Sequence, residues 1–320
     1  MARRNYQNDK AWLPGDIDKR RIFLKFSPEA EGDLMGLVES LNGLQSIEHI
    51  DFNGNHLSAF ANDIKVFRKE VEDGYGFVVI QPSFRLSISE HRAIAWAITN
   101  YLGTPLVQNR DGNRLIHVYD RDRTKRIEDG ARYHQTRQGG SIHTDNVNIP
   151  DHWEYLVFSC VAPAMCGGES ILISGLTVYN DLVQRVPQAL EILTQPFWWE
   201  YRGISEKLYE APVITFNGHD EPLFRYLRPY LASAHNKAKQ PLTAEQFWAL
   251  DVLDSVLESS HLQFRYALKA GEILITNDSQ ILHGRTSFAD YFETATIENY
   301  NQNGKVKLRR SMDRAWVQRS

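Results

Sequence analysis

Five short apolar runs in the second half of the chain restrict its fold more than any other feature. They read EYLVFSCVA, ESILIS, APVITF, LQFRYAL and GEILITN, and they are bounded by Gly, Pro, Asn and Asp. Runs of this length and composition are typical of β-strands. From about residue 140 onward the sequence therefore predicts the strands of a β-sandwich or barrel.

Helices are expected around these strands and around a further buried strand at GYGFVVIQP. Apolar residues at helical spacing precede that strand at Phe60, Ile64, Phe67 and Val71. The same spacing follows it at Ile94, Ile98, Tyr101 and Leu102. We expect the second helix to begin with Ser89 as its cap and to end at Gly103. A third helix, with Thr243 and Gln246 placed as a capping box, is expected to interrupt the later strands.

The chain is expected to form one domain. It has 320 residues, no internal repeat, no low-complexity tract and no linker rich in Gly, Pro or Ser. Its 42% hydrophobic residues are enough for a full core. We predict a single mixed α/β domain over residues 1–320, with a mainly β core. Residues 1–73 are expected to form a helical N-terminal elaboration and residues 74–320 the core, with the helical insert near 243–259.

Charge and hydropathy limit the expected partners and location. The net charge is −4 and both signs are scattered, so the sequence shows no electrostatic footprint for nucleic acid or an anionic membrane. No segment approaches the roughly 18 apolar residues that span a bilayer, and no apolar run follows the basic residues at the start. We expect a cytoplasmic protein with a small-molecule substrate. Cys160 and Cys166 are expected to be buried, reduced thiols.

A histidine and an aspartate two positions apart, in GGSIHTDNVNIP, are the first candidates for a metal site. The pattern His-x-(Asp/Glu) occurs four times in the chain, so the spacing alone carries little weight. At His49, His152 and His219 we interpret it as a surface histidine beside a solvated carboxylate. His143 and Asp145 differ in their surroundings. On an extended segment their side chains project to the same side, where they can bind one metal ion.

A third ligand is required, because two ligands hold a metal poorly. The best candidate is His283 in SQILHGRTSF, 140 residues after His143. The two histidines can meet only if their strands are neighbours in the folded protein. Two histidines and one carboxylate leave open positions on the metal, as in non-haem Fe(II) oxygenases, although a zinc hydrolase can use the same ligands.

Residues suited to a keto-acid co-substrate separate these possibilities. Ser170 lies in CGGESILISG, and Arg310 and Arg314 lie in KLRRSMDRAW. A guanidinium binds a carboxylate through two parallel charge-assisted hydrogen bonds, and a hydroxyl can add a third. A zinc-dependent hydrolase or lyase would leave these three residues without a role. A catalytically silent binding module would not need an intact set of metal ligands.

The motifs HTD, GGESILISG, LHGRTSF and LRRSMDRAW, in this order, resemble those of the Fe(II)/2-oxoglutarate-dependent oxygenases of the taurine dioxygenase and clavaminate synthase-like superfamily. The resemblance extends over roughly residues 74 to 317. It implies a distorted double-stranded β-helix, or jelly roll, with flanking helices. It also implies Fe(II) as cofactor, 2-oxoglutarate and O2 as co-substrates, and release of succinate and CO2. The implied reaction is hydroxylation, desaturation or cyclisation at an unactivated carbon of a small amino-acid-derived or secondary-metabolism substrate.

The same resemblance implies roles for individual residues. Those that correspond to the iron ligands are His143, Asp145 and His283. Ser170 and Arg310 correspond to residues that hold 2-oxoglutarate, and Arg314 corresponds to an arginine that faces the substrate or the keto-acid end. The acid at position 145 argues against halogenation, because halogenating members lack it.

The arginine assignment has one competitor. Arg309 precedes Arg310, and the 27 residues between His283 and Arg310 form a longer gap than the family commonly shows. Alternation along a strand would place Arg310, Met312 and Arg314 on one face and Arg309 on the other. The sequence alone leaves open which of the three arginines faces 2-oxoglutarate.

Three further residues near the motifs have weaker assignments. Arg285 directly follows the HG pair, and we interpret it as a salt bridge at a turn. Asn146 follows Asp145, and Tyr133 lies just upstream of the His-x-Asp motif. Both are expected in the wall of a pocket, where they would contact the substrate.

Overall fold

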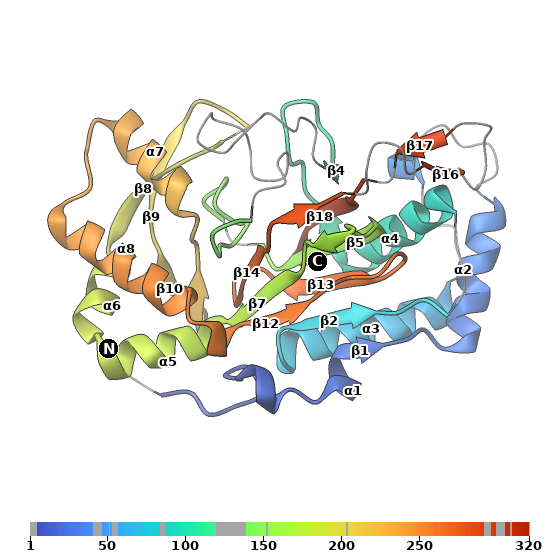
Figure 1. Ribbon diagram of the computed structural model, residues 1–320, viewed down its shortest axis with the longest axis horizontal. Helices are drawn as coiled ribbons and strands as arrows, with labels where there is room; N and C mark the ends of the chain where they lie inside the picture. Colours follow the sequence, from blue (N-terminus) through green and yellow to red (C-terminus); the bar gives the residue numbers. More distant parts are fainter. Residues whose placement is uncertain are drawn as a thin grey trace.

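The computed structural model describes residues 5–40, 47–50, 52, 57–83, 87–119, 139–151, 153–202, 204–290, 296–298, 305–307 and 309–319. A seven-stranded sheet lies at its centre (Figure 1), with β1, β2, β13, β5 and β18 in this order and both β3 and β4 beside β18. All pairings in this main sheet are antiparallel except that of β1 with β2. Its strands are β1 (Phe23–Leu24), β2 (Phe77–Ile80), β3 (Gly103–Pro105), β4 (Leu115–Tyr119), β5 (Tyr155–Ala162), β13 (Ile273–Asn277) and β18 (Ser311–Arg319).

A smaller sheet packs against one face of the main sheet. It is antiparallel, with β7 in the middle. Its strands are β7 (Ser170–Ser174), β12 (Phe264–Tyr266) and β14 (Ile281–Arg285). The side chains between the two sheets include Phe77, Leu172, Leu274 and Met312, which belong to one buried apolar cluster. The predicted buried strand at GYGFVVIQP and the strands at EYLVFSCVA, ESILIS, LQFRYAL and GEILITN are therefore confirmed.

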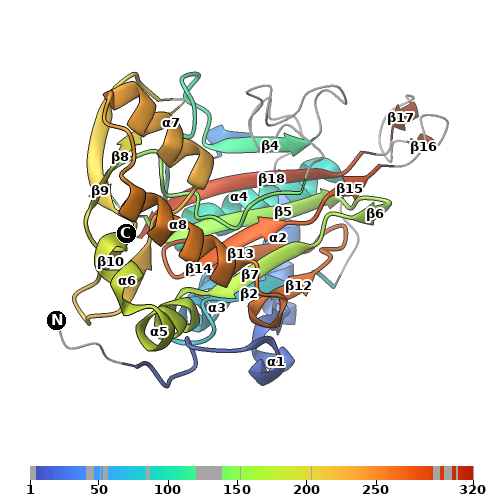
Figure 2. The same ribbon diagram turned by 60° about the vertical axis from the view of Figure 1, so that its left-hand side comes forward.

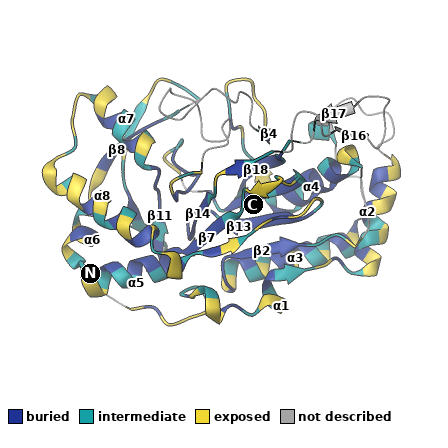
Figure 3. Cartoon of the chain, viewed as in Figure 1, coloured by how far each residue is buried: buried dark blue, intermediate teal, exposed yellow. Residues whose placement is uncertain are grey.

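Alternation along the strands divides the protein into layers. Val78 and Ile80 of β2 pack with the helices on the outer face of the main sheet. Phe77 and Val79 of the same strand point to the other side, into the space between the sheets. Successive side chains of a strand project to opposite faces, so a strand buried on both faces is continuously apolar. Figure 3 shows this burial along the central strands, whereas exposed residues lie on the outer sides of the helices and in loops.

The outer face of the main sheet is covered by α3 (Ser58–Asp73) and α4 (Ile88–Leu102), and α2 (Pro28–Ser40) packs against both helices. Short helical segments precede and join them at α1 (Lys19–Ile22), η1 (Pro14–Asp16) and η2 (Ile47–His49). The four apolar residues predicted to line α3 are all buried. The prediction that Ser89 caps α4 is wrong. Ser87 is the cap, because its hydroxyl accepts the Glu90 N–H while the Glu90 carboxylate accepts the Ser87 N–H. The helix ends at Gly103 as expected.

The outer face of the smaller sheet is covered by an insert far longer than predicted. It contains α5 (Gly175–Arg185), α6 (Pro187–Leu193), α7 (Arg228–Ala238), α8 (Ala244–Leu257) and η4 (Ser260–Leu262). Two hairpins lie within it, β8 (Pro196–Glu200) with β9 (Leu208–Pro212) and β10 (Ile214–Phe216) with β11 (Pro222–Phe224). The capping box of α8 at Thr243 and Gln246 is confirmed. The predicted strand APVITF is divided at Val213, whose N–H and carbonyl bond to Leu193 and Arg225 instead of continuing either hairpin.

The fold is mixed α/β with several multistranded sheets. Two further strand pairs complete the described part, β6 (Cys166–Gly167) with β15 (Phe288–Ala289) and β16 (Thr296–Glu298) with β17 (Lys305–Lys307). Cys160 is buried as expected, but Cys166 is exposed, because β6 forms a short two-stranded pair outside both larger sheets. Within the described residues, each helix is too short or too polar to cross a lipid bilayer.

Candidate functional site

His143 and His283 are brought together by a β-bridge between their backbones. The N–H of His143 donates to the carbonyl of His283 over 2.8 Å, and the reverse bond is 2.7 Å long. The bridge places the segment that carries the His-x-Asp motif beside β14. The centroids of the two imidazole rings lie 4.5 Å apart. Two histidines separated by 140 residues therefore share one point in the fold, as the sequence required.

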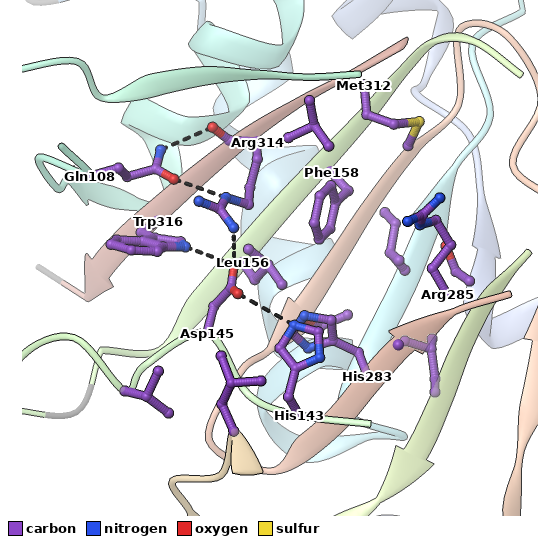
Figure 4. A pocket seen from close by; sticks show the side chains of 18 of the residues that line it. Gln108, His143, Asp145, Leu156, Phe158, His283, Arg285, Met312, Arg314 and Trp316 are labelled. Carbon is purple, nitrogen blue, oxygen red and sulfur yellow. Dashed lines mark hydrogen bonds and ion pairs between the residues drawn. The ribbon is translucent and has the colours of Figure 1, made fainter. Parts of the chain in front are cut away.

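Asp145 completes a compact group with the two histidines (Figure 4). Its Oδ1 lies 3.6 Å from Nε2 of His143. One potential ligand atom from each of the three residues lies within 4.8 Å of the others, and all three residues are buried. Two imidazoles and one carboxylate on one side of a point are the donor set of a 2-His-1-carboxylate metal site. The donor types and their convergence fit an Fe(II) ion.

A hydrogen bond orients His143, and burial sets the protonation state of His283. Nδ1 of His143 lies 2.9 Å from the carbonyl oxygen of Ser141. A carbonyl can only accept, so Nδ1 carries a proton, and Nε2 is the ring nitrogen that faces Asp145. Burial, with a smaller contribution from His143, lowers the pKa of His283 to about 3. His283 is therefore a neutral imidazole near neutral pH.

Asp145 is oriented by two donors on β18. Its Oδ2 accepts hydrogen bonds from Nη1 of Arg314 over 2.8 Å and from Nε1 of Trp316 over 2.9 Å. Burial alone would raise the pKa of this carboxyl, but the Arg314 charge and the contacts with the histidines outweigh burial, and the pKa lies well below its usual value. Asp145 is therefore ionised. Because Oδ2 is occupied, Oδ1 is the oxygen that faces the histidines.

A second carboxyl, that of Asp278 in the turn between β13 and β14, binds the backbone of the segment that carries Asp145. It is fully buried, and its Oδ1 and Oδ2 accept the backbone N–H groups of Asp145 and Asn146 over 3.1 and 2.8 Å. Its Oδ1 also lies 3.4 Å from Nδ1 of His283. Burial and the nearby charge of Asp145 raise the pKa of Asp278. Sequence reasoning missed this residue, because an Asn-Asp-Ser turn between strands is also an ordinary loop.

The three residues lie in the wall of a cavity between the sheets, together with Ser170, Arg310 and Arg314. On β18 and just before it, Arg310, Met312, Arg314 and Trp316 line this cavity, and Arg309 is not among the described lining residues. The side chains therefore follow the alternation expected for this segment. Ala315 and Val317, at the intervening positions, pack under the helices of the main sheet.

Arg310 is a buried cation facing the cavity. It is 8% exposed, and within the described part of the chain no side-chain acceptor binds its guanidinium. Its Cζ lies 5.4 Å from the ring centroid of Phe288. Burial lowers its pKa, and an arginine nonetheless stays charged at physiological pH. A charge buried in this way calls for an anionic partner.

A glycine allows the chain to pass close to Arg310. Gly168 has φ of +73°, a left-handed conformation that favours glycine, and a methyl group there would lie 3.0 Å from Nε of Arg310. The second glycine of CGGESILISG is thus explained by its backbone conformation and by the space that the guanidinium occupies.

Three neighbouring residues had weaker assignments. Arg285 lines the cavity, with its Cζ 4.6 Å from the Phe288 ring centroid, and its expected salt bridge stays a prediction. Asn146 is fully buried beneath the site, where its side-chain amide donates to Ser279 Oγ, and it is not one of the described lining residues. These bonds fix the loop, and its expected contact with the substrate stays a prediction. Tyr133 lies outside the described residues.

The lining residues that were not anticipated include Gln108 and Arg202. Gln108 precedes β4, accepts from Nε of Arg314 through its side-chain oxygen over 2.9 Å, and donates to the Arg314 carbonyl over 3.0 Å. Arg202 enters from the connection between β8 and β9. Neither residue belongs to a recognisable motif, and both become neighbours of the site only through distant chain segments. No signal in the sequence marks them.

Comparisons with known proteins agree with this geometry. The model of the family described as taurine catabolism dioxygenase TauD, TfdA family, matches residues 38–303. The chain is 23% identical to FR-33289 synthase of Streptomyces rubellomurinus over 256 residues, which cover 78% of this chain and 70% of the synthase. It is 27% identical to a taurine hydroxylase-like protein of Stachybotrys chartarum over 238 residues, which cover 70% of this chain and 59% of that protein.

A solved structure has the same fold. Asparagine oxygenase in complex with Fe(II), 2S,3S-3-hydroxyasparagine and succinate superposes with a TM-score of 0.66. The superposition covers 92% of this chain and 93% of the other, at 14% sequence identity. At this identity the likeness shows a common fold.

Proposed function

The chain belongs to the TauD/TfdA family of Fe(II)- and 2-oxoglutarate-dependent dioxygenases, and from this premise we propose that His143, Asp145 and His283 are its iron ligands. The observation that carries the proposal is the convergence of these three buried side chains in the cavity that Arg310 enters. A zinc hydrolase accounts for the first part of this observation but gives Arg310 no ligand. A catalytically silent binding module explains neither the three converging ligands nor the buried Arg310.

We assign the end of the cavity near Arg310 to 2-oxoglutarate. The guanidinium is a planar fork that matches a carboxylate, so Arg310 would bind the distal carboxylate of the keto acid. Ser170 lines the same cavity and is the cross-strand partner of Arg285. Its hydroxyl would add a further hydrogen bond at this end. Arg314 would act mainly by fixing the orientation of Asp145, with its remaining Nη2 available to the substrate.

The chemistry follows from what the chain would hold in place. With Fe(II), 2-oxoglutarate and O2 bound, such a site oxidises a substrate C–H bond and converts the keto acid to succinate and CO2. The protein keeps His283 neutral and the Asp145 carboxylate charged, and the contact of His143 Nδ1 with the Ser141 carbonyl turns Nε2 of His143 toward the same point. Burial of the ligands excludes bulk water from that point, which protects a reactive site from side reactions.

We propose a small, amino-acid-derived substrate that is hydroxylated, or desaturated or cyclised, at an unactivated carbon. Asparagine oxygenase, which shares the fold, was solved with a hydroxylated amino acid in its site. FR-33289 synthase, by its name, makes a single defined compound, and this supports a place in secondary metabolism. We also propose that the two sheets form the distorted double-stranded β-helix of one oxygenase domain over residues 1–320, with residues 1–73 as an N-terminal elaboration.

Anaerobic addition of Fe(II) and 2-oxoglutarate to the metal-free protein tests the assignment. We expect a weak visible charge-transfer band from the iron chelate of the keto acid. Zn(II) in place of Fe(II), and succinate in place of 2-oxoglutarate, are the controls that should give no band. A protein that binds Fe(II) with full occupancy but gives no band with 2-oxoglutarate would contradict the oxygenase assignment.

Replacing Asp278 by asparagine is expected to weaken Fe(II) binding by roughly 10–100-fold, the usual effect of losing a partner of metal ligands. Asparagine has one acceptor oxygen, whereas Asp278 accepts the N–H groups of Asp145 and Asn146 through two. One of these donors would then face an NH2 group. Anaerobic Fe(II) titration of the purified protein measures the effect.

Asp313→Asn is the matched control for this substitution. Asp313 is also buried, but it pairs with Arg92 and His117 on the far side of the main sheet. We expect it to lower thermal stability and to leave Fe(II) affinity near that of the wild type. If Asp278→Asn and the wild type bind Fe(II) with equal affinity, Asp278 does not help to position the metal ligands.

A further inference from the structure

The two ends of the cavity are lined by different parts of the fold. At one end, the guanidiniums of Arg285 and Arg310 both lie over the ring of Phe288, on β15. At the other end, Arg202 and Tyr230 are supplied by the insert, from the β8–β9 connection and from α7. Figure 2 shows β8, β9 and α7 on the opposite side of the molecule from β15. The insert end is therefore free for a second ligand when 2-oxoglutarate occupies the Phe288 end.

Arg202 is held in a fixed plane at the insert end. Its Cζ lies 4.0 Å from the ring centroid of Tyr230, and its Nη1 donates to Oε1 of Glu200 over 3.1 Å. The side chain is 30% exposed, so one edge of the guanidinium remains accessible. Stacking and pairing order the group before any ligand arrives, which lowers the entropy lost on binding.

The pairing with Glu200 does not neutralise this end of the cavity. Glu200 is 4% exposed, and its second oxygen forms an ion pair with Lys237. Arg202 and Lys237 thus share a single carboxylate. The cluster keeps one net positive charge, and Arg202 is its member that lines the cavity.

The net charge of the whole cavity also favours an anionic ligand. Among the described lining residues, the charged groups are the arginines 202, 285, 310 and 314 and the carboxylate of Asp145, an excess of three positive charges. Fe(II) would add two positive charges and 2-oxoglutarate two negative charges, so the excess would be unchanged after loading. Glu200, which pairs with Arg202, is itself balanced by Lys237, so these two residues leave the excess unchanged. A half-buried cavity with such an excess favours an anionic ligand.

We propose that Arg202, stacked on Tyr230, binds an oxyanionic group of the substrate, and that the substrate is a small amino acid with an acidic side chain. This inference rests on the proposed function, because it assigns the Phe288 end to 2-oxoglutarate. Carboxylate, sulfonate and phosphate groups all offer paired oxygens to a planar guanidinium. The shared chemistry is the oxyanion, and the test distinguishes among the three.

The test uses the anaerobic Fe(II)- and 2-oxoglutarate-loaded protein and follows the shift of its visible band as a probe binds. The probes form matched pairs: aspartate with asparagine, cysteate with serine, and O-phosphoserine with serine. We expect the acidic member of at least one pair to bind at least about tenfold more tightly than its neutral partner, as a charge-assisted hydrogen bond requires. The preferred pair identifies the acidic group.

Variants decide whether Arg202 is responsible. Arg202→Gln is expected to abolish the preference for the acidic probe, and Arg202→Lys to retain part of it. Lys237→Gln is the matched control, because it removes a cation from the same Glu200 carboxylate without touching the cavity, and it should reduce the preference less than Arg202→Gln does. Each measurement compares binding constants for the same pair of probes.

Three results would overturn the inference: equal binding of both members in every pair, no binding of any probe at millimolar concentration, or an unchanged preference in Arg202→Gln. In each case the visible band still forms in the wild type. Failure of the proposed function is distinguishable, because the band itself would then be absent before any probe is added.

Discussion

Replacing His283 by alanine is expected to abolish stoichiometric Fe(II) binding and 2-oxoglutarate turnover. The residue would supply one of only three protein ligands, and its imidazole is already neutral and buried against His143. We expect the loss of affinity to exceed the roughly 10–100-fold effect of partners that do not touch the metal. Alanine at His143 or Asp145 should have the same effect. Iron content after anaerobic reconstitution, with succinate formation as a second readout, measures it.

The chain offers a matched histidine as control. His219 belongs to another His-x-Glu pair, lies exposed in the turn between β10 and β11, and should tolerate alanine without loss of iron. Circular dichroism of each variant confirms that the fold is retained. Full iron occupancy in His283→Ala would exclude the triad assigned here.

Replacing Arg310 by alanine is expected to raise the dissociation constant of 2-oxoglutarate by about 100-fold or more. A bidentate contact contains two charge-assisted hydrogen bonds, each worth ~1.5–3 kcal/mol, and about 1.4 kcal/mol corresponds to tenfold in affinity. Lysine should rescue poorly, because it is a point charge without the planar fork. Titration of the visible band with 2-oxoglutarate gives the constants, and iron content should stay close to that of the wild type.

Arg309 is the internal control for the strand register. It is half-buried and is not among the described residues that line the cavity, so Arg309→Ala should leave 2-oxoglutarate affinity within a few-fold of the wild type. If Arg309→Ala weakens 2-oxoglutarate binding and Arg310→Ala does not, the inward and outward faces of this segment are interchanged. The roles of both arginines would then have to be reassigned.

Periodicity and motif order predicted the parts of the fold in which local sequence decides the structure. The apolar faces of α3 and α4, the box that caps α8 and most of the strands follow from local spacing, because burial imposes that spacing. His143, Asp145 and His283 could be grouped because a metal restricts ligand types, and because one strand pairing brings them together. The cap of α4 was misplaced by two residues, since Ser87 and Ser89 are both good capping residues and only the Glu90 contact distinguishes them.

The residues that the sequence did not reveal are those defined by distant contacts. Asp278 acts through backbone N–H groups more than 130 residues earlier in the chain. Arg202 reaches the cavity only because the β8–β9 hairpin folds back over the loop that follows Asp145, where the Tyr209 hydroxyl donates to the Val147 carbonyl. Neither contact leaves a periodic pattern. A long insert with mixed helices and hairpins also gives weaker local signals than a single amphipathic helix.

The order of strands in the main sheet also affects how the protein folds. Tyr155 of β5 is opposite Asn277 of β13 and Val317 of β18, so both neighbours of this strand come from more than 100 residues later in the chain. Pairings of this kind give a high contact order, and the loop-closure entropy must be paid before the strands gain their contacts. The α2–α3 helical pair can form early from local contacts, whereas the metal ligands meet only after the distant strands have joined. Refolding should therefore be slow, and the capacity to bind iron should return in its last kinetic phase.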